Sequence, residues 1–194
     1  MQKDEPIKEV SEEEAGVPGH EQPSVVSEIR GWARDVFFAI GTAVIIVVFF
    51  YQPVKVEGTS MLPELVDQER IFVNKFVYKI ETIARRDIVV FWYPLDTTKS
   101  YIKRVIGLPG DVVEVRRGQV RVNGETLDES YVPPNFFDRR TYSPVYVESG
   151  TYYVLGDHRS QSNDSRMWGL VPQENIYGKA VFRYWPMSKM GTLY

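Results

Sequence analysis

The chain has 194 residues and a formal net charge of −3 at pH 7, which suits one domain with accessory segments and argues against nucleic-acid binding. It lacks cysteine, which excludes thiolate catalysis, disulfides and cysteine-ligated metal sites. Its two histidines, His20 and His158, exclude a multi-histidine metal site, so we expect neither a metal nor an organic cofactor.

Residues 1–28 form the first segment, which is rich in Glu, Pro, Gly and Ser and poor in large apolar side chains. Such a composition cannot bury enough apolar surface to offset the entropy lost on ordering. We therefore predict a disordered acidic tail over 1–28.

Residues 29–52 are predicted to form a transmembrane helix. Residues 36–51 are uncharged and almost wholly apolar, with Trp32 just before them. As a helix, Trp32 to Tyr51 would rise about 30 Å, enough to cross the hydrocarbon core of a bilayer. A buried core helix and an export signal are the alternatives. Arg30 and Arg34 precede the apolar run, so the positive-inside rule favours a cytoplasmic N-terminus and an extracytoplasmic remainder.

The remaining residues, 53–194, change to short segments rich in Val, Ile and aromatic residues. The predicted strands are 70–76, 87–93, 101–106, 112–116, 119–122, 151–155 and 178–184. Gly, Pro, Asn or Asp bounds each segment, and no long amphipathic helix interrupts them. Arg117-Gly118 and Asn123-Gly124 are expected to be hairpin turns. The fold class is therefore mostly β, with an antiparallel sheet domain after one helix.

The first group of residues suited to catalysis is VEGTSMLP, residues 56–63, directly after the apolar run. Gly58 and Pro63 favour a tight turn around Ser60, where a hydroxyl and backbone N–H groups could converge. Serine beside glycine is usually no more than a turn, so this motif is weak evidence for a nucleophile by itself.

The second group is YIKRVIGLPGD, residues 101–111. Strand alternation sends Lys103 and Arg104 to opposite faces, so one of these cations must lie among apolar neighbours. Burial lowers the pKa of a lysine and makes it a base near neutral pH, whereas arginine stays protonated. Lys103 could therefore be a neutral base and Arg104 an ion-pair partner, although two solvated charges on an edge strand are the ordinary alternative.

The third group is GDHRSQSNDSRMWG, residues 156–169. It concentrates hydroxyls, carboxylates and guanidinium groups in one loop, a composition suited to a hydrogen-bonded scaffold that orients a neighbouring base. A polar surface loop is the alternative.

Together these groups resemble the type I signal peptidase family. Its G-x-S-M-x-P box matches residues 58–63, its Y-I-K-R-x-x-G-L-P-G-D box matches 101–111, and its G-D-N-R-x-x-S-x-D-S-R-x-W-G box matches 156–169. Its arginine–aspartate strand box resembles RDIVVF, residues 86–91. The resemblance covers roughly residues 53–185, with the boxes in order.

The resemblance implies a catalytic dyad with Ser60 as nucleophile and Lys103 as general base. It implies that the Ser162 hydroxyl hydrogen-bonds the lysine. The implied supporting residues are Gly58, Ser162, Asp164, Arg166, Arg104 and Asp157, with an ion pair between Asp164 and Arg166. The implied substrate-binding residues are Val54, Val56, Met61, Leu65, Tyr101 and Ile102. The Ser60 N–H looks like one oxyanion donor, with a second near Gly58.

Two positions depart from the family pattern. His158 stands where the family often has asparagine, and Glu64 stands where threonine is common. Neither position inherits a role.

The implied substrates are exported preproteins whose signal segments end in an A-x-A-like pattern of small residues. The implied location is the inner or plasma membrane, in contact with the lipid bilayer, with a single pass and the catalytic domain on the extracytoplasmic side. The sequence gives no indication of oligomeric state.

Three other functions are compatible with parts of the sequence. A self-cleaving Ser–Lys regulator usually carries a DNA-binding module, and nothing basic or helical of that kind precedes this domain. A membrane-tethered β domain could bind peptides without catalysis. A histidine triad using His158 is the third, but the lysine already supplies a base.

Overall fold

The computed structural model describes residues 25–193, which divide into two compact units, 25–42 and 43–193. Helix α1 (Val25–Phe50) covers most of the predicted apolar helix. It begins before residue 28, so the last residues assigned to the acidic tail are helical instead. The rest of that predicted tail lies outside the described residues.

The transmembrane helix predicted for 29–52 corresponds in position to α1. Among the helices of residues 25–193, none is long and apolar enough to cross a membrane.

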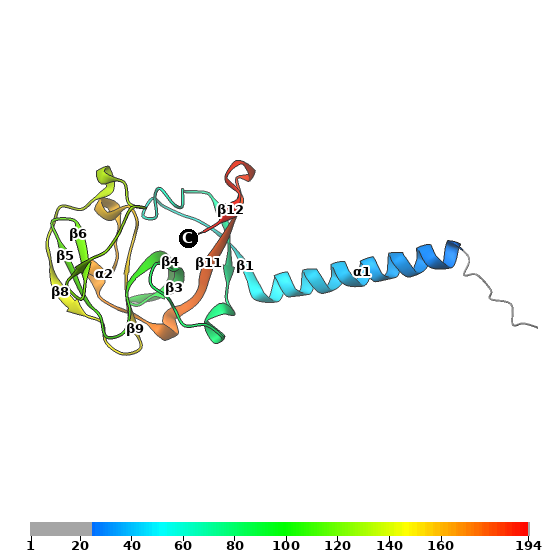
Figure 1. Ribbon diagram of the computed structural model, residues 1–194, viewed down its shortest axis with the longest axis horizontal. Coiled ribbons are helices and arrows are strands. Elements are labelled where there is room, and N and C mark those ends of the chain that lie inside the picture. Colours follow the sequence, from blue (N-terminus) through cyan, green and yellow to red (C-terminus); the bar gives the residue numbers. More distant parts are fainter. Residues whose placement is uncertain (1–24, 194) are drawn as a thin grey trace, which may run out of the picture. The chain divides into compact units, whose positions relative to one another are not determined.

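The second unit is mostly antiparallel β structure, as predicted, and its strands form two sheets (Figure 1). The larger sheet has the strand order β1-β2-β11-β3-β4-β9-β10, and β12 pairs with β11. Its strands are β1 (Tyr51–Lys55), β2 (Arg70–Asn74), β3 (Ile88–Tyr93), β4 (Asp96–Gly107), β9 (Thr151–Leu155), β10 (Val171–Pro172), β11 (Ile176–Trp185) and β12 (Gly191–Thr192).

The smaller sheet has the order β7-β6-β5-β8. Its strands are β5 (Val112–Arg116), β6 (Gln119–Val122), β7 (Glu125–Thr126) and β8 (Tyr142–Tyr146). Short helices connect the strands: η1 (Val77–Lys79), η2 (Pro134–Phe136), η3 (Arg159–Gln161), α2 (Ser165–Trp168), η4 (Gln173–Asn175) and η5 (Met187–Lys189). Residues 108–150, the excursion between β4 and β9, contain the smaller sheet. The strands β4 and β9 on either side of it are neighbours in the larger sheet.

The predicted hairpin turns are present. Arg117 and Gly118 have φ values of 50° and 86° between β5 and β6, and Asn123 and Gly124 have values of 53° and 85° between β6 and β7. Positive φ at both central residues matches the twist of a two-residue hairpin. Each of the seven predicted strands overlaps an observed strand.

The core consists of three apolar clusters. One contains Val56, Met61 and Leu65 together with residues of β2 and β3. A second packs Val89 and Phe91 of β3 against Val105 of β4. The third lies under the smaller sheet. The first two clusters fix the segment after β1 and the middle of β4, which are the segments that carry Ser60 and Lys103.

Candidate active site

Ser60 lies in a turn that follows β1 and is fixed from both sides. The Gly58 N–H donates to Asp67 Oδ1 at 2.8 Å, and Gly58 has a φ of 88°, a conformation that favours glycine. After the serine, Met61 is buried in the core. The turn therefore presents the Ser60 side chain from a backbone anchored at both ends.

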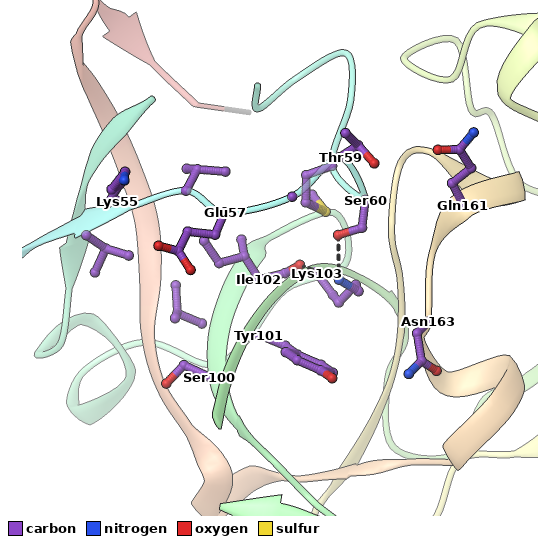
Figure 2. Close-up of a pocket in the computed structure, with 15 residues that line it drawn as sticks. Lys55, Glu57, Thr59, Ser60, Ser100, Tyr101, Ile102, Lys103, Gln161 and Asn163 are labelled. Atoms are coloured by element: carbon purple, nitrogen blue, oxygen red, sulfur yellow. Dashed lines mark hydrogen bonds between the residues drawn. The ribbon is translucent and has the colours of Figure 1, made fainter. Parts of the chain in front are cut away.

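Lys103 lies in β4 opposite Val89 of β3, and the residue is only 4% exposed. Its Nζ donates to Ser60 Oγ at 2.8 Å and to the Ile102 carbonyl at 3.0 Å. Figure 2 shows the two side chains pointing toward one another. A serine hydroxyl and a lysine amine at this distance can exchange a proton directly.

The surroundings of Lys103 favour its neutral form. Burial lowers the pKa of Lys103 from its ordinary value of 10.5 to about 8, and the charges of Asp164 and Asp157 oppose this only in part. A substantial fraction of the amine is therefore neutral, and able to accept a proton, close to physiological pH.

Arg104 leaves β4 on the opposite face and is also buried. Its Nε and Nη2 donate to the two carboxylate oxygens of Asp157 at 2.9 and 2.7 Å. The Arg104 guanidinium group stacks on Tyr131, with Cζ 4.4 Å from the centroid of the tyrosine ring. The structure thus contains the ion pair expected of Arg104. Both neighbouring basic side chains are buried, Arg104 paired with a carboxylate and Lys103 next to a hydroxyl.

Asp164 organises the loop between β9 and β10. It caps α2 by accepting from the Arg166 N–H, and its carboxylate binds the Arg166 guanidinium at 2.8 Å. It also accepts from the Gly156 N–H at 3.1 Å. Arg166 continues the network to Asp138 at 2.9 Å. The predicted Asp164–Arg166 ion pair is present, and it ties the loop to the excursion between β4 and β9.

Ser162 differs from its predicted role. Its Oγ is buried and has no hydrogen-bond partner within the described chain, while Lys103 bonds to Ser60 and to a carbonyl instead. A Cβ placed on Gly156 would lie 2.2 Å from this oxygen. Ser162 therefore packs tightly against Gly156, and the hydrogen bond to the lysine predicted from the resemblance is absent.

A cleft of about 450 Å³ opens over the Ser60–Lys103 pair. Five of the predicted substrate-binding residues line it: Val54, Val56, Met61, Tyr101 and Ile102. Leu65 does not. It is fully buried in the core, because the apolar pattern that marks a pocket wall also marks a core position.

Other residues that line the cleft were not predicted. Figure 2 places Lys55, Glu57 and Ser100 on one side of the dyad and Gln161 and Asn163 on the other. Gln161 and Asn163 belong to the polar loop 156–169, so the polarity of that loop was the signal that could have indicated them.

Two strand edges beside the cleft have no partner strand among residues 25–193. β1 is the end strand of the larger sheet, and β4 pairs with β9 only from Arg104 onward. An extended peptide can add to such an edge through backbone hydrogen bonds while its side chains enter the pockets.

The backbone N–H of Ser60 is the predicted oxyanion donor. It makes no hydrogen bond to any other group of residues 25–193. It is therefore available to a substrate oxygen at the nucleophile.

Three comparisons place the chain among known proteins. The family model described as signal peptidase, peptidase S26, matches residues 29–185. A signal peptidase I of Leptolyngbya laminosa is 36% identical over 91% of this chain and 89% of its own length. A probable signal peptidase I-2 of Synechocystis is 41% identical over 81% of this chain and 72% of its own length. A crystal structure of a signal peptidase I from Enterococcus faecalis matches 52% of this chain and 97% of its own, with 35% identity and a TM-score of 0.45. The chain therefore belongs to the signal peptidase family, peptidase S26.

Proposed function

We propose that the chain removes signal peptides from exported preproteins, with Ser60 as the nucleophile and Lys103 as its general base. The observation that carries this proposal is the 2.8 Å hydrogen bond between Lys103 Nζ and Ser60 Oγ in a buried setting. Burial also lowers the pKa of Lys103 to about 8, as a base working near neutral pH requires.

The reaction proceeds in two steps. Neutral Lys103 removes the Ser60 proton as Oγ attacks the scissile carbonyl, and the protonated lysine returns a proton to the leaving amine. The resulting acyl-enzyme is then hydrolysed by a water that Lys103 activates. The Ser60 N–H stabilises the oxyanion in both steps. The chain's own groups thus supply the nucleophile, the base and one oxyanion donor.

The specificity that we propose is cleavage after small residues in an A-x-A-like pattern. Val54, Val56, Met61, Tyr101 and Ile102 make the wall of the cleft largely apolar. Extended pairing of the peptide along the free edge of β4 would direct alternate side chains into this wall. Small side chains at alternate positions fit such a binding mode.

The location that we propose is the extracytoplasmic side of the inner or plasma membrane. The family is membrane-associated, and exported preproteins emerge on that side. A single pass with a cytoplasmic N-terminus stays a prediction from the sequence.

The test is cleavage of a preprotein with an A-x-A site by the purified full chain, comparing wild type, Ser60→Ala and Lys103→Ala. We expect cleavage after the second small residue by wild type and none by either variant. Cleavage by Ser60→Ala would refute the assigned nucleophile. Binding without cleavage by wild type would indicate a peptide-binding domain, and cleavage only within its own chain would indicate a self-cleaving regulator.

A further inference from the structure

The Ser60 N–H belongs to the same peptide group as the Thr59 carbonyl. A trans peptide group is planar, and its C=O and N–H bonds point in opposite directions. Whatever holds the Thr59 carbonyl therefore also sets the direction of the Ser60 N–H, the donor that our proposed function assigns to the oxyanion.

Two donors hold the Thr59 carbonyl. One is the Leu62 N–H at 3.2 Å, which closes the turn. The other is Nδ1 of His158, 3.3 Å from the same oxygen. A carbonyl oxygen only accepts hydrogen bonds, so this contact requires the proton on Nδ1. The second donor comes from a segment almost a hundred residues away in the sequence, and it is a side chain that substitution can test.

The His158 ring is itself fixed in place. It stacks on Phe136 with ring centroids 4.1 Å apart and an interplanar angle of 27°. The His158 backbone N–H donates to the Ser60 carbonyl at 3.0 Å, and the residue is 8% exposed. His158 therefore contacts the peptide groups on both sides of the Ser60 α-carbon, one through its ring and one through its backbone.

We propose that His158 is a positioning residue that orients the Ser60 N–H toward the substrate oxyanion by holding the Thr59 carbonyl, with Phe136 as the support of its ring. This inference rests on the proposed function of the Ser60–Lys103 pair. It gives a role to a position where the sequence departs from the family pattern.

Two substitutions separate the hydrogen bond from the ring packing. His158→Phe keeps an aromatic ring to stack on Phe136 and removes the Nδ1 donor. His158→Asn removes the stack and keeps an N–H donor near the backbone. Loss of a whole oxyanion donor lowers kcat by about 100- to 1000-fold in other enzymes, and a misdirected donor is a partial loss. We expect His158→Phe to lower kcat by about 10- to 100-fold with KM unchanged, and His158→Asn to retain kcat within about threefold.

Two further readouts distinguish orientation of the N–H from a structural effect. A peptide aldehyde with an A-x-A sequence adds to Ser60 and places an oxygen in the oxyanion position, whereas the cleaved product peptide does not. We expect His158→Phe to weaken aldehyde binding by the same factor as kcat and to leave product binding and the midpoint of urea unfolding unchanged. The pH midpoint of kcat/KM should stay at the wild-type value, because Lys103 is untouched.

The outcomes separate the two proposals. A wild type that fails to cut the preprotein overturns the proposed function. If wild type cuts and His158→Phe matches its kcat and aldehyde affinity, this inference alone fails. It also fails if the pH midpoint moves with the loss of rate, because His158 would then act through Lys103, or if aldehyde and product binding weaken equally.

Discussion

Lys103 is expected to destabilise the fold that holds it. Burial lowers its pKa from 10.5 to about 8, so the folded protein disfavours the bound proton. At 1.36 kcal/mol for each pH unit, this difference amounts to about 3 kcal/mol. Well below pH 8 the lysine is charged in both the folded and unfolded states, and the free energy of unfolding is lowered by the whole penalty. Between pH 8 and 10.5 only the unfolded state keeps the proton, so the contribution of Lys103 to the free energy of unfolding becomes less unfavourable as pH rises.

The substitution Lys103→Met removes the amine and keeps most of the side-chain volume. We expect it to raise the free energy of unfolding at pH 7 by about 2–3 kcal/mol while abolishing cleavage, since the lost hydrogen bond to Ser60 offsets part of the gain. Urea unfolding followed by tryptophan fluorescence measures the change. Lys99→Met is the matched control, because its side chain is 62% exposed and an exposed substitution changes stability by less than about 0.5 kcal/mol.

The pH dependence decides whether burial of the charge is the cause. The difference in unfolding free energy between Lys103→Met and wild type should shrink as pH rises from 8 toward 10.5. A variant that is less stable than wild type at pH 7, or a difference that does not change with pH, would refute the reasoning.

Three further predictions concern the same site. Because only neutral Lys103 accepts a proton, kcat/KM should rise about tenfold per pH unit up to about pH 8 and then level off, and a flat pH–rate profile would contradict a lysine base. Arg104→Met should lower the free energy of unfolding by about 3–5 kcal/mol in urea titrations, because it leaves buried Asp157 unpaired. The double variant Arg104→Met/Asp157→Leu should recover part of this stability. If the single and double variants lose the same stability, the broken ion pair is not the cause. Gly156→Ala should lower kcat, because its Cβ would lie 2.4 Å from the Ser60 carbonyl oxygen and must displace the turn that carries Ser60. An unchanged kcat would show that this turn can shift without loss of activity.

The strands that sequence reasoning identified are those with clear alternation and strong turn signals. Among the strands of five or more residues it missed β1 and β8, which contain Pro53 and Pro144 respectively, and it also missed the two-residue strands β7, β10 and β12. Both β1 and β8 lie at the end of a sheet, where a residue without an N–H is tolerated. β1 was also obscured because it continues the apolar run of α1 without a break. The first half of β4, residues 96–100, was also missed. It is largely exposed, and its polar sequence lacks the apolar alternation that marked the other strands.

The candidate site was predictable where chemistry depends on residue type and unpredictable where it depends on packing. Lys103 in an apolar strand and Ser60 in a glycine-containing turn can both be recognised in the sequence. In the structure Lys103 Nζ lies 2.8 Å from Ser60 Oγ. Whether Leu65 lines a pocket or fills the core, and whether Ser162 reaches the lysine, depends on side-chain positions that no local pattern encodes. The contact between His158 and Phe136 is of the same kind, because it joins two loops.

The excursion between β4 and β9 could be mistaken for a dispensable insertion, since both proposed catalytic side chains lie outside it. It nevertheless supplies partners to three residues of the loop 156–169: Phe136 to His158, Glu129 to Arg159 and Asp138 to Arg166. A minimised enzyme that joined β4 directly to β9 would keep Ser60 and Lys103 and lose the side chains that hold this loop. Attempts to shorten the protein should therefore graft a replacement for these contacts and not only a shorter connection.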